Sequence, residues 1–561
     1  MNSNNVRSSG KNSTKKPWTG MNTQGGSAQR ILVPVLSRRK FFSRVTSATA
    51  AAGVLGLMAP SIFAGRPSDG QRDAFGPLFR PGAHPEPKHG PKKGLDSVRR
   101  WNQISIDASG LDHTPVAPGE NRVFGEQLGP CRAARAIAIV HIAMFDTVNA
   151  VFQEFKSYTG LKAPHVPHSM EAAISQAAHD TLAALFPSQA ASFDAFLAED
   201  LDDVKNKKER AAGISLGRRA AAAILALRAN DGSQIPEPRV GIGHITSNLP
   251  GHWRQDPISL IPLALGAHWG ECLPFVLQSS SQFRVPAFPL LTSPEYAAAY
   301  DEVKRLGGDD IVTPTDRTPD QTHAGIFWAY DGTPSLCAPP RLYNQLTVHI
   351  ADQMGTDGIE LARLLALINL AMSEAGLAIW ESKYYYDIWR PITGIREADA
   401  GTGPTGLGDG NPATAGDPTF RPLGAPASNL HGPNFTPPFP AYPSGHAGFG
   451  GALFQTLRNF YGTDDIAFTF VSDEFNGITR GNDGNARPLL PRSFSSLSQA
   501  EEENGQSRIY LGIHWSFDKS EGILQGRRVA DYVFQHAFTP LHGHSEKPPH
   551  SEKLPHTTGK P

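Results

Sequence analysis

The sequence predicts an all-α protein built from two helical-bundle halves, with the chemistry carried by the C-terminal half. Two observations lead to this fold class. Apolar residues recur at helical spacing through most of the chain, and the alternation that is typical of strands is scarce. With 561 residues, 39% of them hydrophobic, the chain is long enough to bury a substantial core.

The first 98 residues are predicted to lie outside both bundles. Residues 1–64 have the layout of a polar leader and a twin-arginine export signal, in which Arg38 and Arg39 precede a short Ala-rich apolar run. Residues 65–98 are rich in Pro, Gly and charge, and are predicted to be a linker. We expect a periplasmic or secreted protein whose mature chain begins near Gly65. The apolar run is too short for a stable membrane span.

The N-terminal bundle is assigned to residues 99–310. Its first strong segment is apolar on nearly every face, which predicts a buried central helix. Pro, Ser and Asn-Asp-Gly signals then mark where later helices begin and end. The predicted helices span 132–151, 170–186, 188–201 with Ser188 as the cap, 208–230 and, after a Pro-rich irregular stretch, 293–306.

The C-terminal bundle is assigned to residues 320–540. Its longest segment carries an apolar stripe of about seven turns. Residues 398–441 are Gly- and Pro-rich and too polar for a core element. Residues 541–561 repeat a His-Ser-Glu-Lys pattern and are predicted to be a disordered His/Pro/Lys tail. The predicted helices span 341–354, 358–383, 444–460, 466–476, 496–510 and 515–538.

Charge and cysteine content exclude several classes of function. The formal charge of −1 and the absence of a dense Lys/Arg run give no reason to expect nucleic acid as a partner. Cys131, Cys272 and Cys337 allow one disulfide at most and have no zinc-ligand spacing.

Three short stretches of the C-terminal bundle supply the groups of a buried oxyanion site. Together they offer three cations, a hydroxyl, a glycine amide and two imidazoles. Buried cations are strongly destabilising unless an anion lies among them, so the set predicts a tetrahedral or trigonal oxyanion of phosphate size. The residues are Lys383 and Arg390, then Ser444, Gly445 and His446, and finally Arg508 and His514.

The first two stretches suit such a site in different ways. Lys383 and Arg390 are seven residues apart, which would place them on one face of a helix about 10 Å apart along its axis. Pro391 disfavours helix at Arg390 and should put this arginine at a helix end. Ser444 fits the N-cap of a helix whose free first-turn amides face an anion, and Gly445 permits close approach.

The third stretch needs a break to bring its two groups together. Arg508 and His514 are six residues apart and would point in different directions on an unbroken helix. Gly512 suggests that Arg508 ends one helix and His514 opens the next. Asp518 follows His514 by one turn and could orient its ring as an outer hydrogen-bond partner.

These motifs resemble those of the vanadium-dependent haloperoxidases, especially their chloroperoxidase-type members, which share a fold with histidine acid phosphatases. The likeness covers about residues 320–535 and extends to the stretches that flank the motifs. These stretches are Phe327-Trp-Ala-Tyr-Asp331-Gly, Pro339-Pro-Arg-Leu-Tyr-Asn-Gln345, Trp380-Glu-Ser-Lys383, Phe439-Pro-Ala-Tyr-Pro-Ser-Gly-His446 and Phe470-Val-Ser-Asp-Glu-Phe-Asn-Gly477.

The resemblance implies one vanadate per site and a role for each matching residue. His514 would bond vanadium axially, and His446 would move protons while peroxide is activated. Asp331 would pair with the site arginine, whereas Trp380 and Phe439 would line the pocket. The vanadate oxygens would be held by Lys383, Arg390, Ser444, Gly445 and Arg508.

The implied reaction is the oxidation of halide by hydrogen peroxide to a hypohalous-type agent that halogenates an organic acceptor. Lys383 would polarise the peroxide. Phe439 stands where bromoperoxidases of the family often have histidine, which predicts chloride oxidation in addition to bromide. A homo-oligomer is compatible with the sequence.

Two other functions fit the same groups. In an acid phosphatase, His514 would form a phosphohistidine and His446 would protonate the leaving group, with the cations stabilising the transition state. An exported protein that only binds an oxyanion would have no need of the proton-handling His446. The flanking stretches favour the peroxidase over both.

Overall fold

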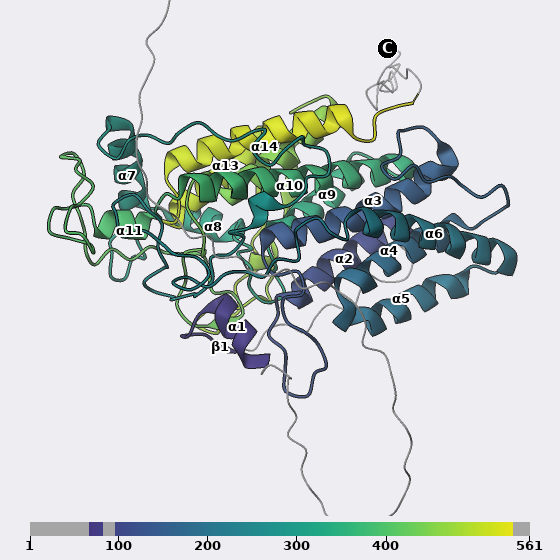
Figure 1. Ribbon diagram of the computed structural model, residues 1–561, viewed down its shortest axis with the longest axis horizontal. Coiled ribbons are helices and arrows are strands. Elements are labelled where there is room, and N and C mark those ends of the chain that lie inside the picture. The colour runs from purple at the N-terminus through teal and green to yellow at the C-terminus, as the bar shows by residue number, and fades with distance from the viewer. Residues whose placement is uncertain (1–66, 82–95, 542–561) are drawn as a thin grey trace, which may run out of the picture. The chain divides into compact units, whose positions relative to one another are not determined.

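The structure, a computed structural model, describes residues 67–81 and 96–541. Helices dominate these residues, as the sequence predicts (Figure 1). The predicted export signal in residues 1–64, most of the predicted tail and part of the predicted linker lie outside the described residues. The division into bundles at 99–310 and 320–540 stays a prediction.

The N-terminal half begins earlier than the sequence analysis predicts. A helix and a short strand occupy part of the expected linker, and the Ser188 region forms a 3-10 turn, so that the following helix begins at Ala190. The elements are α1 (Pro67–Phe75), β1 (Arg80–Pro81), α2 (Ser97–Asp112), α3 (Pro130–Phe152), α4 (Met170–Leu185), η1 (Pro187–Gln189), α5 (Ala190–Asp203), α6 (Lys207–Leu227), η2 (Trp269–Glu271) and α7 (Pro294–Leu306).

The C-terminal half contains the predicted long helices and two short ones that the pattern did not indicate, α8 and α11. The elements are α8 (Pro319–Phe327), α9 (Pro339–Gln353), α10 (Gly358–Tyr386), α11 (Pro391–Arg396), β2 (Leu430–His431), α12 (Gly445–Tyr461), β3 (Phe468–Phe470), η3 (Asp473–Phe475), β4 (Arg492–Phe494), α13 (Leu497–Tyr510) and α14 (Ser516–His536).

The helix predicted over 466–476 is wrong. This stretch forms β3, which pairs antiparallel with β4, followed by the turn η3. Successive side chains of β3 alternate between buried and exposed positions, with Phe468 and Phe470 buried and Thr469 exposed. The other pairing joins β1 to β2 and thereby attaches the N-terminal segment to the C-terminal half.

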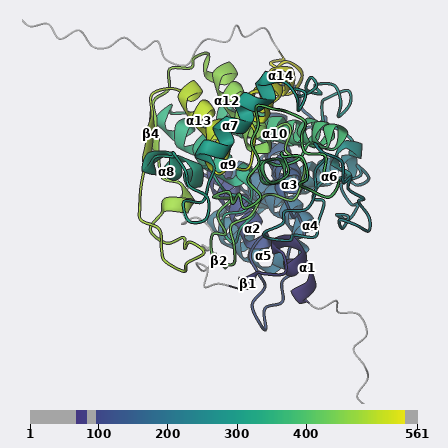
Figure 2. The ribbon, with the colours of Figure 1, turned by 90° about the vertical axis from the view of Figure 1, so that its left-hand side faces the viewer.

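The core is organised around α10. One hydrophobic cluster includes residues from α2, α3, α4, α9, α10, α12 and α14, and α10 packs against α3, α9, α12 and α14. Figure 1 and Figure 2 both show α10 between α3 and α14. The apolar stripe read from the sequence is therefore buried on all sides. The helix ends where Asp387 adopts a left-handed conformation, with φ of 52°.

Within residues 67–81 and 96–541, two helices are long and apolar enough to cross a membrane by length and composition, namely α3 and α10. Both are core helices of this fold, because 89% and 100% of their most apolar windows are buried inside the protein. Their hydrophobicity is thus accounted for by packing.

Candidate active site

The three cations of the sequence motifs come from the ends of three helices. Lys383 lies in the last turn of α10, Arg390 caps α11, and Arg508 lies in the last turn of α13. Their exposures are 0%, 1% and 0%. Lys383 and Arg390 do not share a helix as the spacing suggested, because α10 ends at Tyr386. Arg390 has an extended backbone before Pro391, which begins α11.

Backbone carbonyls of the 439–441 segment hold two of these cations. Lys383 Nζ donates to the carbonyls of Pro440 and Ala441 at 2.8 and 2.9 Å. Arg390 Nε donates to the carbonyl of Phe439 at 2.8 Å. The segment that leads into α12 therefore fixes the lysine and the arginine relative to each other.

Several buried guanidinium N–H groups have no acceptor within the described residues. These atoms are Nη2 of Arg390 and Nε and Nη1 of Arg508. Arg508 does donate from Nη2 to Asp331 Oδ1 at 2.6 Å, the pair that the resemblance implies. Buried polar groups are nearly always hydrogen-bonded, so these donors suit an additional acceptor rich in oxygen.

Hydrogen bonds at both ring nitrogens fix the tautomer of His514. Nε2 lies 2.9 Å from Arg390 Nη1, and because arginine can only donate, Nε2 is the acceptor. Nδ1 therefore carries the hydrogen and donates to Asp518 Oδ2 at 2.8 Å, the contact that the one-turn spacing predicts. Burial and the neighbouring Arg390 and Lys383 hold the pKa of His514 well below its usual value.

A glycine lets Arg508 and His514 meet at one site. α13 ends at Tyr510 and α14 begins at Ser516, so the predicted helix break is present. Gly512 has φ of 72°, and a Cβ there would lie 2.4 Å from the carbonyl oxygen of Gly307. Both the conformation and the close approach require glycine at this position.

The second histidine, His446, lies in the first turn of α12 and is only partly engaged. Nε2 bonds to the Ala329 carbonyl, which can only accept, and lies 3.8 Å from Asp331 Oδ1. Nδ1 therefore keeps its lone pair, and no hydrogen bond to it is present in the part of the chain that the structure describes. Burial and the nearby charge of Arg508 hold the pKa of His446 well below its usual value.

The N-terminus of α12 confirms one prediction from the motif. Ser444 is the N-cap, and its hydroxyl accepts from the Ala447 amide at 3.4 Å. The amides of Gly445 and His446, at the start of the helix, have no intrahelical partner. A Cβ on Gly445 would lie 3.2 Å from the Trp380 ring, so the glycine allows the aromatic wall to approach closely.

The positive charges of the site destabilise one another. Burial lowers the pKa of Lys383, with Arg390 and Arg508 adding repulsion, and burial lowers the pKa of Arg390 to about 9. Asp518 partly offsets this charge, although burial raises the pKa of its own carboxyl to about 7. An oxyanion bound among these groups would relieve the repulsion and accept hydrogen bonds from the guanidinium N–H groups that have no acceptor within the described residues. The residues therefore fit an oxyanion.

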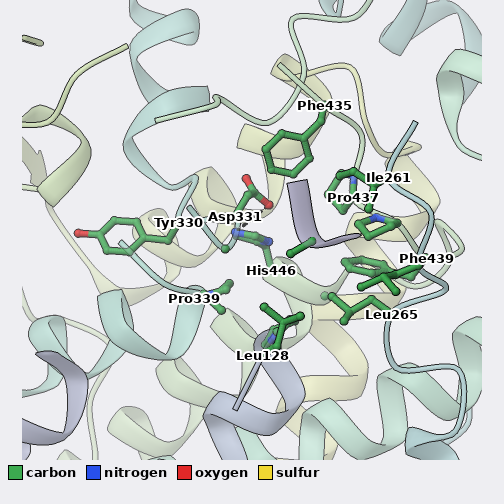
Figure 3. A pocket seen from close by; sticks show the side chains of 18 of the residues that line it. Leu128, Ile261, Leu265, Tyr330, Asp331, Pro339, Phe435, Pro437, Phe439 and His446 are labelled. Carbon is green, nitrogen blue, oxygen red and sulfur yellow. Dashed lines mark ion pairs between the residues drawn. The ribbon is translucent and has the colours of Figure 1, made fainter. Parts of the chain in front are cut away.

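A pocket gives access to part of this site (Figure 3). Asp331, Gly445, His446, Arg508 and His514 line it on the polar side. We call the two histidines with Lys383, Arg390 and Arg508 the cationic floor, of which His446, Arg508 and His514 line the pocket. Figure 3 shows Asp331 and His446 near the centre, with Ile261, Leu265 and Phe439 to their right.

Trp380 and Phe439 line the pocket, as the resemblance implies. Their ring centroids are 4.9 Å apart, and the Lys383 ammonium lies 5.1 Å from the centre of the Phe439 ring. The Trp380 indole donates to the Leu265 carbonyl at 3.0 Å, which anchors the tryptophan on a loop of the N-terminal half.

Sequence reasoning missed two parts of the pocket. The Ala329 carbonyl, which holds His446, leaves no signal in residue identity because every residue has a carbonyl. The second part is a set of apolar side chains from separate segments, which we call the apolar wall. Its members are Phe75, Leu128, Ile261, Leu263, Leu265 and Phe435.

Comparison with known proteins finds similar sequences and similar folds. Residues 363–543 match the family model of the VCPO second helical-bundle domain. A vanadium chloroperoxidase from Curvularia inaequalis is 29% identical over 495 residues, which cover 74% of this chain and 78% of that protein.

Solved structures of bacterial enzymes share the fold. The first bacterial vanadium-dependent iodoperoxidase has a TM-score of 0.61 at 22% identity, covering 78% of this chain and 96% of its own. A holo-type bacterial vanadium-dependent chloroperoxidase has a TM-score of 0.56 at 16% identity, covering 80% and 98%. The matched domain, the curated relative and the solved structures thus give one result: residues 363–543 match a VCPO second helical-bundle domain, and the chain is similar in sequence to a vanadium chloroperoxidase and in fold to these bacterial enzymes.

Proposed function

We propose that this protein is a vanadate-dependent haloperoxidase, which uses hydrogen peroxide to oxidise halide to a hypohalous-type halogenating agent. The observation that carries the proposal is the set of unsatisfied guanidinium N–H groups on Arg390 and Arg508, buried beside His514 at the end of a pocket. Vanadate has the charge and the oxygen atoms that these donors require. The curated relative, a vanadium chloroperoxidase, supports the same assignment.

Vanadate would be held by the cationic floor, with the Ser444 hydroxyl and the Gly445 amide completing the set of donors. His514 Nε2 is the nitrogen with a lone pair, since Nδ1–H is committed to Asp518. When bound, vanadate supplies a Lewis acid that activates hydrogen peroxide toward a halide without itself changing oxidation state. Lys383 would polarise the peroxide through its positive charge.

His446 is suited to accept a proton from incoming hydrogen peroxide. Its Nε2–H is held by the Ala329 carbonyl, so the free Nδ1 is the basic nitrogen. The lowered pKa keeps this ring neutral at mildly acidic pH, where a histidine of usual pKa would be largely protonated. Asp331 accepts a hydrogen bond from Arg508 Nη2 and so fixes the position of this guanidinium at the site.

The test compares two activities in one preparation. With vanadate and hydrogen peroxide, the protein should brominate monochlorodimedone, whereas hydrolysis of p-nitrophenyl phosphate should be weak and should be abolished by vanadate. Arg508→Gln should raise the vanadate concentration needed for bromination. Arg528→Gln, a matched change of an exposed arginine on α14, should not. Phosphatase turnover without any vanadate-dependent bromination would assign the phosphatase activity instead.

We further propose that the protein is exported in folded form by the twin-arginine route and acts in the periplasm or outside the cell. The support is the order of the twin arginines, the weakly apolar run and the small residues near Gly65 in the sequence. Replacing Arg38 and Arg39 by lysine should retain the protein in the cytoplasm, as measured by fractionation. An unchanged location would contradict export by this route.

A further inference from the structure

The apolar wall faces the same pocket as the cationic floor but has no role in holding an oxyanion. Aromatic and aliphatic side chains form it, and Figure 3 shows Phe435, Ile261, Leu265 and Leu128 around the central Asp331 and His446. A pocket with a mostly apolar lining and a few convergent polar groups is the usual form of a site for a small organic molecule. We therefore expect the apolar wall to contact a ligand other than peroxide or halide.

One member of the wall, Phe75, is contributed by a segment far away in sequence. It ends α1, and the segment 67–81 is attached to the rest of the protein at separate points. Asp73 forms an ion pair with Arg239, and β1 pairs with β2. These attachments place a side chain from the N-terminal segment beside residues of the C-terminal half.

Neighbouring rings hold Phe75 in its orientation without enclosing it. Its ring centroid lies 5.0 Å from that of Phe79 and 5.6 Å from that of Phe124 in an edge-on arrangement. Phe75 is only half-buried, and it lines the pocket. An aromatic ring held by aromatic neighbours is pre-oriented to pack against another flat, apolar group.

We propose that the apolar wall binds an uncharged, electron-rich aromatic acceptor of the halogen, and that Phe75 determines which acceptors are halogenated there. This inference rests on the proposed function. The reaction is Ar–H + HOX → Ar–X + H2O, where X is the halogen. The C–X bond forms while the C–H and O–X bonds break, and the released proton joins the hydroxide to give water. The ring carbon is oxidised and the halogen is reduced.

An acceptor bound at the wall would meet the oxidant before it leaves the pocket. The product should then differ from that made by hypohalous acid in free solution, because a ring bound at the wall would be held in a restricted set of orientations when it reacts. Acceptors without apolar surface would gain little from the wall and would react outside the pocket.

The experiment uses the vanadate-loaded full chain with bromide, hydrogen peroxide and 1-naphthol. Two quantities are measured. The rate quotient is the rate of naphthol bromination divided by the rate of bromide oxidation without the acceptor, and the isomer ratio is the ratio of the brominated naphthol isomers. In wild type we expect an isomer ratio different from that given by hypobromous acid. Phe75→Ala should lower the rate quotient about tenfold and move the isomer ratio to the solution value.

Leu78→Ala is the matched control, because Leu78 lies in the same segment but is 48% exposed and does not line the pocket. It should behave as wild type, and Phe75→Leu should fall between wild type and Phe75→Ala. If bromide is oxidised but Phe75→Ala keeps the wild-type quotient and isomer ratio, this inference alone is wrong. If wild type oxidises no bromide with vanadate, the proposed function fails and the inference fails with it.

Discussion

The cationic floor and the apolar wall of the pocket are specified by the sequence in different ways. Each floor residue lies in a short stretch with its own local reason for its position, such as a helix N-cap, a helix end or a glycine break. The wall is assembled from α1 and from loops near residues 128, 261–265 and 435, none of which carries a motif. The positions of the floor residues thus follow from short stretches of sequence, whereas the shape of the pocket beside them is set by tertiary packing.

The largest effect that this comparison predicts is at the floor. His514→Ala should abolish tight vanadate binding and lower turnover by more than about 100-fold, since loss of an outer partner of a metal ligand alone costs about 10- to 100-fold. Calorimetric titration with vanadate measures the first effect. His536→Ala, at the exposed end of α14, is the control and should bind vanadate as wild type does. Equal affinity in His514→Ala would remove this residue as the ligand.

His446→Ala should separate binding from turnover within the floor. Vanadate affinity should be nearly retained, while turnover with peroxide and bromide falls by about 10²- to 10⁴-fold, because proton transfer by a positioned group contributes that much. The His536→Ala variant again serves as control. A parallel loss of affinity and turnover would show that His446 acts mainly as part of the oxyanion cradle.

The lowered pKa of His446 also predicts a pH-dependent stability. Because the folded ring resists protonation, the unfolded chain binds more protons below about pH 6.5, and the vanadate-free protein should lose stability as pH falls. His446→Ala should lose less between pH 7 and pH 5.5, by at most about 1.4 kcal/mol per pH unit. Urea unfolding of both proteins at the two pH values measures the difference. Parallel curves would contradict it.

A smaller effect on vanadate binding is expected at Asp518, which contacts His514 of the cationic floor. Asp518→Asn removes the charged acceptor of the His514 Nδ1–H group and should weaken vanadate binding by about 10- to 100-fold. Asp465→Asn is the matched control, because Asp465 is exposed in the turn after α12. If both variants bind vanadate like wild type, the orientation of the His514 ring does not depend on Asp518.

The smallest effect is expected where the floor meets the aromatic side of the pocket. Phe439→His would place a hydrogen-bonding group near the site of peroxide activation and should reduce chlorination relative to bromination. The change should be within about tenfold, since a typical net hydrogen bond is worth about 1 kcal/mol. Chlorination and bromination rates at mildly acidic pH measure it. Absence of chlorination by wild type, or an unchanged ratio in the variant, would contradict the proposed role of Phe439.

The floor could be read from the sequence because its elements are governed by local rules. Pro391 placed Arg390 at a helix end, Ser444 capped α12, and Gly512 separated Arg508 from His514, all as the sequence indicated. The expected shared helix for Lys383 and Arg390 failed, because the left-handed turn at Asp387 has no strong sequence signal.

Elsewhere, tertiary packing overrode the local pattern. Residues 466–476 look amphipathic at helical spacing, yet β3 forms because β4, which follows more than twenty residues later, offers a pairing partner. The segment 67–81 reads as a Pro- and Gly-rich linker, yet it docks through Asp73 and β1 on residues far along the chain. Such long-range partners cannot be inferred from spacing within a single element.

The close contact between Gly307 and Gly512 makes the substitutions allowed at one position depend on the other, although the two residues are far apart in the sequence. A Cβ on Gly307 would lie 2.5 Å from the Cα of Gly512, just as a Cβ on Gly512 would strike the Gly307 carbonyl. Neither position can accept a larger residue while the other backbone stays in place, so substitutions at the end of α7 are constrained by a turn that serves the site. Among homologous sequences, these two glycines should be retained together or replaced together.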